Sequence, residues 1–188
     1  MNILCEQLPD TAEIDGVEYE LNTDFRICLR IILACEDNEL TNQEKITIMI
    51  RLLYKKLPSN LSEAARIGKL FLDCGDDKEK ENIEEPRVFS FEKDANYIYT
   101  AINQTHHIDL EQVGYMHWWK FVYMFRDINE NTFFSKLVDL RSRKQRGKLT
   151  KEEKEACAKM HDIIDLPHVK TAEETAAENR FLELFGKC

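Results

Sequence analysis

Apolar residues recur at helical spacing along most of this chain. Residues 25–35 are apolar round most of the helix circumference, which predicts a deeply buried helix with Thr23 or Asp24 at its start. Residues 42–57 continue the spacing as far as Pro58, a residue that stops a helix. Further helix-length patterns lie at residues 64–74, 91–104, 110–128, 133–145, 151–164 and 172–186.

Polar residues that cap helices precede most of these patterns. A Thr followed three residues later by Glu forms a capping box, in which each residue satisfies a backbone N–H of the other. Three such pairs precede helix-length patterns: Thr41 with Glu44, Thr150 with Glu153, and Thr171 with Glu174. The other expected caps are Ser62, Ser90, Asp109, and Asn131 or Thr132.

A short hairpin is predicted near the N-terminus. Asp15 and Gly16 lie between two alternating segments and suit a two-residue turn with positive φ. The predicted fold class is therefore mostly α, a helical bundle of about seven helices with a small N-terminal β-hairpin.

A charged segment divides the chain. Residues 73–85 hold seven acidic residues and two lysines, and Pro86 follows. We expect the hairpin and apolar helices at 1–75, an acidic linker at 76–88 and a helical region at 89–188, which packs with the first region into one compact unit. The linker is interpreted as a solvated loop, with an acidic docking arm as the alternative.

The composition disfavours several classes of binding partner. The chain has 188 residues and a formal net charge of -9, which repels nucleic acid and anionic membranes. Its apolar runs are too short and too charged to span a bilayer, so no membrane partner is expected. Its six cysteines include no C-x-x-C pair, which favours a reduced, cytosolic protein without a zinc or redox motif.

Recognisable catalytic motifs are missing. The sequence has no phosphate-binding Gly-rich loop, no H-E-x-x-H and no G-x-S-x-G. His106 and His107 would point about 100° apart on a helix, which is poor geometry for one metal ion. We therefore expect no enzyme, no cofactor and no metal site. His117 is interpreted as a neutral core histidine bonded to a backbone carbonyl.

The segment HWWKFVYMFRDI, residues 117–128, has two apolar faces when drawn as a helix. His117, Trp118 and Phe121 lie on one face. The opposite face carries the candidate partner contacts Tyr115, Trp119, Tyr123 and Arg126. A second apolar face indicates either a central helix or a surface for another protein, because these residue types are common at interfaces.

One segment is strongly basic. Residues 136–151 contain seven Lys or Arg residues and a single acid, Asp139. The candidate basic patch consists of Arg141, Arg143, Lys144 and Arg146. Such a patch could bind phosphates or an acidic protein, while the alternative is cations that complement a helix C-terminus. Without interleaved aromatics, nucleic acid is an unlikely partner.

Three motifs within residues 89–167 carry a family resemblance. They are FEKDANYIY, IDL followed by HWWKF, and TFFSK leading to RS. This region resembles the small phage proteins called gene product fifteen, which are encoded in the tail module near the tape-measure gene.

The resemblance implies a non-enzymatic tail-assembly chaperone that binds the tape-measure protein. It implies action in the cytoplasm of the infected bacterial host, with the tape-measure or another tail protein as partner and self-association as a further expectation. The alternative is an adaptor, including a host-interacting phage protein, that binds nucleic acid or an acidic protein through residues 136–151.

Overall fold

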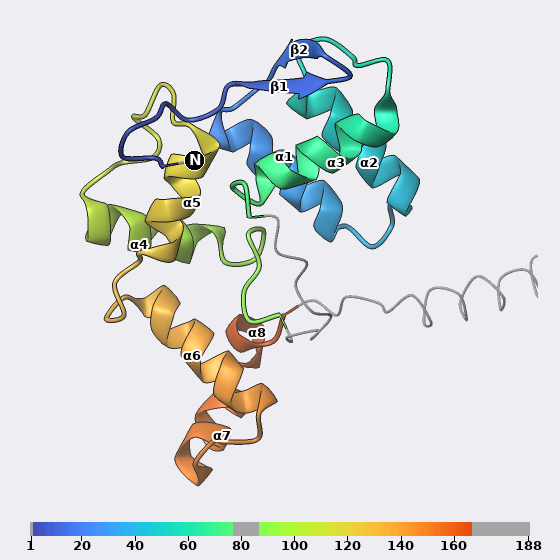
Figure 1. Ribbon diagram of the computed structural model, residues 1–188. Coiled ribbons are helices and arrows are strands. Elements are labelled where there is room, and N and C mark those ends of the chain that lie inside the picture. The colour runs from blue at the N-terminus through green and yellow to red at the C-terminus, as the bar shows by residue number, and fades with distance from the viewer. Residues whose placement is uncertain (1, 77–86, 167–188) are drawn as a thin grey trace, which may run out of the picture.

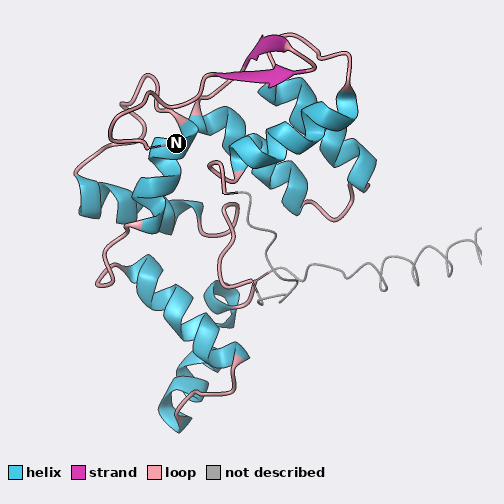
Figure 2. Cartoon of the chain, in the orientation of Figure 1, coloured by secondary structure: helices cyan, strands magenta, loops and turns pink. Residues whose placement is uncertain are grey.

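The computed structural model describes residues 2–76 and 87–166, and these residues are mostly helical (Figures 1 and 2). They form one β-hairpin, β1 (Thr11–Ile14) and β2 (Val17–Glu20), and eight helices. The helices are α1 (Phe25–Glu36), α2 (Asn42–Leu53), α3 (Leu61–Leu72), α4 (Ala95–His106), α5 (Trp118–Arg126), α6 (Phe133–Gln145), α7 (Lys151–Lys159) and α8 (His161–Ile164). The predicted fold class is confirmed.

The hairpin turns where the sequence predicts it. Asp15 and Gly16 have φ values of 51° and 76°, so both central residues of the turn are left-handed. The strands pair antiparallel with Ile14 opposite Val17. The Ile14 side chain is only 2% exposed, so one face of the hairpin closes over the core.

Four of the predicted caps are present, and the first of them is Asp24 at α1. Thr41 with Glu44 and Thr150 with Glu153 form capping boxes at α2 and α7. Thr132 caps α6 by accepting from the Ser135 N–H. The start of α3 differs from the prediction, because Asn60 rather than Ser62 is the cap. Ser90 and Asp109 are not helix caps, because Asp94 precedes α4 and His117 caps α5. The capping box of Thr171 with Glu174 lies outside the described residues.

The predicted helix over residues 110–128 is wrong for its first eight residues. Residues 115–117 are not helical and His117 is extended; Phe25 N–H donates to Met116 O, and Trp118 N–H donates to Thr23 O. The preceding loop is held by the Arg26 guanidinium, which donates to Leu110 O at 2.8 Å and Val113 O at 2.6 Å. Tertiary partners thus satisfy backbone groups that a helix would otherwise pair, and α5 begins only at Trp118.

One hydrophobic core draws on residues from both sides of residues 77–86. Its buried members run from Ala12 to Phe134 and include Phe25, Phe71 and Phe121. α1, α2 and α3 pack together beneath the hairpin, and α4 and α5 pack beside them (Figure 1). A smaller cluster of Leu137, Cys157 and Ile164 joins α6, α7 and α8.

Candidate partner-binding surfaces

The two adjacent tryptophans fasten the start of α5 to the end of α3. Trp118 Nε1 donates to Leu72 O at 2.9 Å, and Trp119 Nε1 donates to Phe71 O at 2.8 Å. The last carbonyls of a helix lack their usual partners four residues on, and the two indole N–H groups supply donors to two neighbouring ones. Phe71 O also accepts from the Cys74 N–H at 3.0 Å. Trp118 and Trp119 are 3% and 6% exposed, which makes both of them core residues.

His117 caps α5 from a buried position. Its Nδ1 accepts from the Trp119 N–H at 3.1 Å, and its Nε2 lies 3.0 Å from Pro9 O. This arrangement needs a neutral ring with the proton on Nε2. Burial lowers the pKa of His117 and so favours the same neutral form. The prediction of a neutral core histidine bonded to a backbone carbonyl agrees with this geometry.

The four candidate contacts around the tryptophans are separated in the structure. Tyr115 precedes α5 and is 60% exposed, and its hydroxyl is 2.7 Å from Thr23 Oγ1. Trp119 is buried, Tyr123 is half-buried and Arg126 is exposed at the last position of α5. The expectation of one continuous helical face for Tyr115, Trp119 and Tyr123 is therefore wrong, because Tyr115 is not on the helix. For Trp119, the chain's own α3 provides the cover.

Arg141 lies inside the protein and not in an exposed basic patch. It is 2% exposed and binds the Asp94 carboxylate through two bonds, at 2.5 Å and 2.9 Å. Its guanidinium also donates to the carbonyls of Val88, Ile163 and Ile164. All five N–H donors of the guanidinium are used, so Arg141 joins α6 to α8 and to the segment before α4.

The other candidate cations of residues 136–151 are partly neutralised. Arg143 pairs with Asp139 at 2.9 Å and with Glu153, and Lys144 pairs with Asp165 at 2.5 Å. Arg146 is exposed. The four residues thus do not form one free basic surface, which weakens the geometric basis of the adaptor alternative.

A groove forms between α1 and the segment that precedes α4. We call it the Phe89 groove; its volume is about 440 Å³. Three apolar side chains, Ile32, Phe89 and Phe91, contribute to it, and Glu36 and Arg87 form an ion pair at its edge. Burial raises the pKa of Glu36. The full lining is Ile32, Cys35, Glu36, Asn38, Lys45, Arg87, Phe89 and Phe91.

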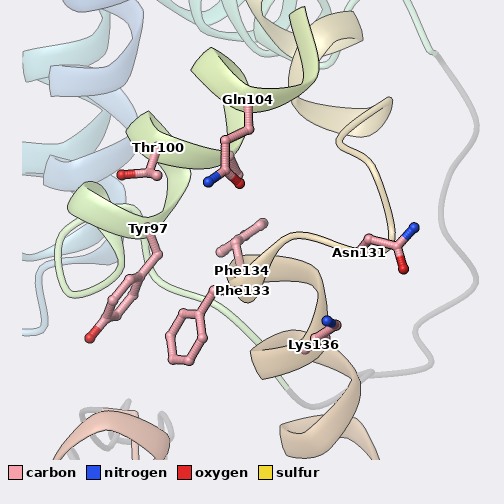
Figure 3. Close-up of a pocket in the computed structure, with 8 residues that line it drawn as sticks. Tyr97, Thr100, Gln104, Asn131, Phe133, Phe134 and Lys136 are labelled. Carbon is pink, nitrogen blue, oxygen red and sulfur yellow. The ribbon is translucent and has the colours of Figure 1, made fainter.

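A second groove of about 460 Å³ runs between α4 and the start of α6 (Figure 3). We call it the α4–α6 groove. Phe133 stands at its edge, 48% exposed, with its ring centroid 4.9 Å from that of Tyr97. The full lining is Tyr97, Thr100, Ala101, Gln104, Asn131, Phe133, Phe134 and Lys136.

The sequence interpretation missed both grooves. Each is made by segments distant in the chain, so no local pattern reveals its shape. The sequence did hold one indication of the α4–α6 groove: residues 95–106, which form α4, contain no Asp, Glu, Lys or Arg.

Few groups in the described residues are arranged for chemistry. Residues 2–76 and 87–166 contain no group of three or more His, Cys, Asp or Glu that could hold a metal ion. His106 Nε2 lies 2.8 Å from Met124 O, and His107 is the C-cap of α4. His161 is exposed beside Asp162, whereas His168 lies outside the described residues. None of the helices described is long and apolar enough to cross a membrane.

Comparison with known proteins gives one match. The family described as Bacteriophage Gp15 protein matches residues 4–166. The chain belongs to the bacteriophage Gp15 family. No curated protein and no solved structure matches it.

Membership of the Gp15 family confirms the resemblance drawn from FEKDANYIY and HWWKF, and extends it to the hairpin and the first three helices. It indicates a protein of phage structure or morphogenesis. The Gp15 match includes every residue of the Phe89 groove and of the α4–α6 groove.

Proposed function

We propose that this Gp15 family protein is a non-catalytic tail-assembly chaperone that holds an apolar helical segment of the tape-measure protein in the cytoplasm of the infected host. The observation that carries the proposal is the family match over residues 4–166. A tape-measure chain exposes apolar helices before the tail tube encloses it, so a protein that covers such helices prevents their aggregation.

The Phe89 groove is the binding site we propose. An amphipathic helix binds by laying its apolar face in a hydrophobic groove and its polar flanks along the edges. Ile32, Phe89 and Phe91 supply the apolar contacts. Glu36, Arg87 and Lys45 supply both signs of charge at the edge, suiting a helix with mixed charged flanks.

The Phe89 groove lies between an N-terminal helix and a segment from the second half of the described chain. Ile32, Cys35 and Glu36 belong to α1, whereas Arg87, Phe89 and Phe91 belong to the segment that leads into α4. A bound helix would therefore contact the N-terminal and C-terminal parts of the chain together. Binding would stabilise the folded form in proportion to its occupancy.

The protonation states of two cysteines, Cys28 and Cys74, are consistent with a non-catalytic role. Burial raises the pKa of the Cys28 thiol to about 12 and that of Cys74 to about 11, so neither is a thiolate at neutral pH. Both ring nitrogens of His117 are engaged by backbone groups.

Matched cysteine variants test the site. Cys35 is exposed and lines the Phe89 groove, while Cys5 is exposed and lies outside both groove linings. Each variant is co-expressed with the tape-measure protein of the same phage, and the amount that copurifies is measured. Cys35→Arg should lose the complex because a charged side chain fills the groove, whereas Cys5→Arg should retain it.

Two results would overturn different parts of the proposal. Equal recovery with Cys35→Arg and Cys5→Arg, both folded by circular dichroism, would remove the Phe89 groove as the site. Failure of the unmodified chain to copurify with the tape-measure protein would contradict the chaperone function itself.

A further inference from the structure

α4 differs from the other described helices in its chemistry. It has no Asp, Glu, Lys or Arg in 12 residues, although 32% of the chain is charged. Each of the other seven helices in the described part of the chain carries at least one such residue. The lack of charge is not explained by burial, because one side of α4 is exposed: Asn96, Tyr99, Thr100, Asn103 and Gln104.

This uncharged face continues into the α4–α6 groove. Thr100 and Gln104 belong to both, and the groove floor is made by Ala101 and Phe134, which are 1% and 5% exposed. Figure 3 shows Gln104 of α4 pointing toward Phe134 of α6, with Phe133 beside Tyr97. Lys136 is the only charged residue in the groove lining, and Tyr99 donates to Asp109 at the opposite edge of the face.

An exposed aromatic ring and a hollow therefore lie next to each other on one surface. Phe133 is 48% exposed at the groove edge, and the groove beside it measures about 460 Å³. A two-fold interface brings the same patch of two copies together, so each copy must offer both the projection and its receptor. This surface offers both.

Charge selects a second copy as the occupant. Each chain carries a net charge of -9, so two copies repel each other unless their contact face is free of like charges. The amides of Asn96, Asn103 and Gln104 each contain a donor and an acceptor, so they can pair with their own kind across a two-fold axis. A partner of opposite net charge would require neither an uncharged contact face nor amides that pair with their own kind.

We propose that two copies of this chain associate through the exposed face of α4, with Phe133 of each copy seated in the α4–α6 groove of the other. This surface shares no lining residue with the Phe89 groove. The proposal therefore does not depend on the tape-measure function, and a dimer leaves the Phe89 groove available.

Two threonines in matched settings test the interface. Thr100 Oγ1 donates to Asn96 O at 2.8 Å on α4, and Thr47 Oγ1 donates to Gln43 O at 2.8 Å on α2. Both threonines are exposed, so Thr100→Glu and Thr47→Glu each add one negative charge at an equivalent helical position. Sedimentation equilibrium of the full chain should show a concentration-dependent dimer that Thr100→Glu weakens at least about tenfold and Thr47→Glu leaves unchanged.

A second position and a salt series complete the test. Asn103→Glu should also weaken the dimer, and the affinity of the unmodified chain should not fall as salt rises, because no ion pair holds the interface. A chain that remains monomeric at all concentrations would overturn the proposal. So would a dimer that survives both Thr100→Glu and Asn103→Glu, since its contact must then lie elsewhere.

Discussion

Single residues of the types that usually mark interfaces are internal in this protein. Trp118, Trp119 and Arg141 are all buried, and backbone carbonyls accept from each of them. No buried side-chain nitrogen or oxygen in the described residues lacks a hydrogen-bond partner. The sequence could not show this, because the carbonyls of Phe71, Leu72 and Ile164 come from other elements. His117 was predicted to be a neutral core residue from its residue type and its apolar neighbours in the sequence, but the carbonyl that it contacts, Pro9 O, also comes from another part of the chain.

Replacing Arg141 should destabilise the fold strongly. Arg141→Met leaves the Asp94 carboxylate, which has 0% side-chain exposure, without its cation, and this should lower the free energy of unfolding by about 3–5 kcal/mol. Arg146→Met removes an exposed arginine from the same segment and should cost less than about 0.5 kcal/mol. Urea denaturation measures both. Equal stability of the two variants would contradict the buried ion pair.

Stability should depend on pH through His117. Its pKa is lowered in the fold, so the unfolded chain takes up this proton first as pH falls below the ordinary value of 6.5. The contribution of His117 is therefore complete above that pH and is lost below it, until the folded pKa is reached. The free energy of unfolding should fall by at most about 1.4 kcal/mol per pH unit from this group.

His117→Asn isolates this effect. Asn is a good N-cap acceptor but does not titrate, so the variant should show a shallower loss of stability between pH 7 and about 5. Denaturation curves across that range compare the two proteins. Identical pH profiles would mean that His117 is not held neutral at the start of α5.

At the scale of elements, the sequence correctly predicted the helices whose N-terminal capping motif is local in sequence. Thr41 and Thr150 are examples, because each capping box lies within four residues of sequence. The prediction of a helix over residues 110–117 failed for the opposite reason. Arg26 holds the carbonyls of Leu110 and Val113 from α1, and periodicity carries no information about that contact.

Glycines with positive φ follow α3 and α6, in different surroundings. Gly75 has φ +77°, and a Cβ placed there would lie 3.2 Å from Trp119 Cη2. Gly147 has φ +67° with nothing within 4 Å. Gly147→Ala should cost about 1–2 kcal/mol from the left-handed backbone alone. Gly75→Ala should cost a further 1–3 kcal/mol or so, since the indole must shift.

Thermal or urea unfolding of both variants checks the packing of the tryptophan against the end of α3. The difference between the two alanine variants is the informative quantity, because the backbone term is shared. If Gly75→Ala is no more destabilising than Gly147→Ala, Trp119 does not pack against Gly75 as described.

At the scale of the whole molecule, the two grooves differ in the chemistry of their edges. The Phe89 groove has an ion pair and a lysine at its edge, and the α4–α6 groove is nearly free of charge. A hetero-partner with charged flanks suits the first, and a second copy of an acidic chain suits the second. The sequence predicted the fold class and the family but neither groove, because each depends on how distant segments pack.

The solubility of the tape-measure protein tests the central claim most directly. The tape-measure protein of the same phage is expressed alone and together with this chain, and its soluble fraction is measured after centrifugation. Co-expression should move the tape-measure protein from the pellet to a soluble complex that contains both chains. A tape-measure protein that is equally insoluble with and without this chain, while the chain itself remains folded, would contradict the account.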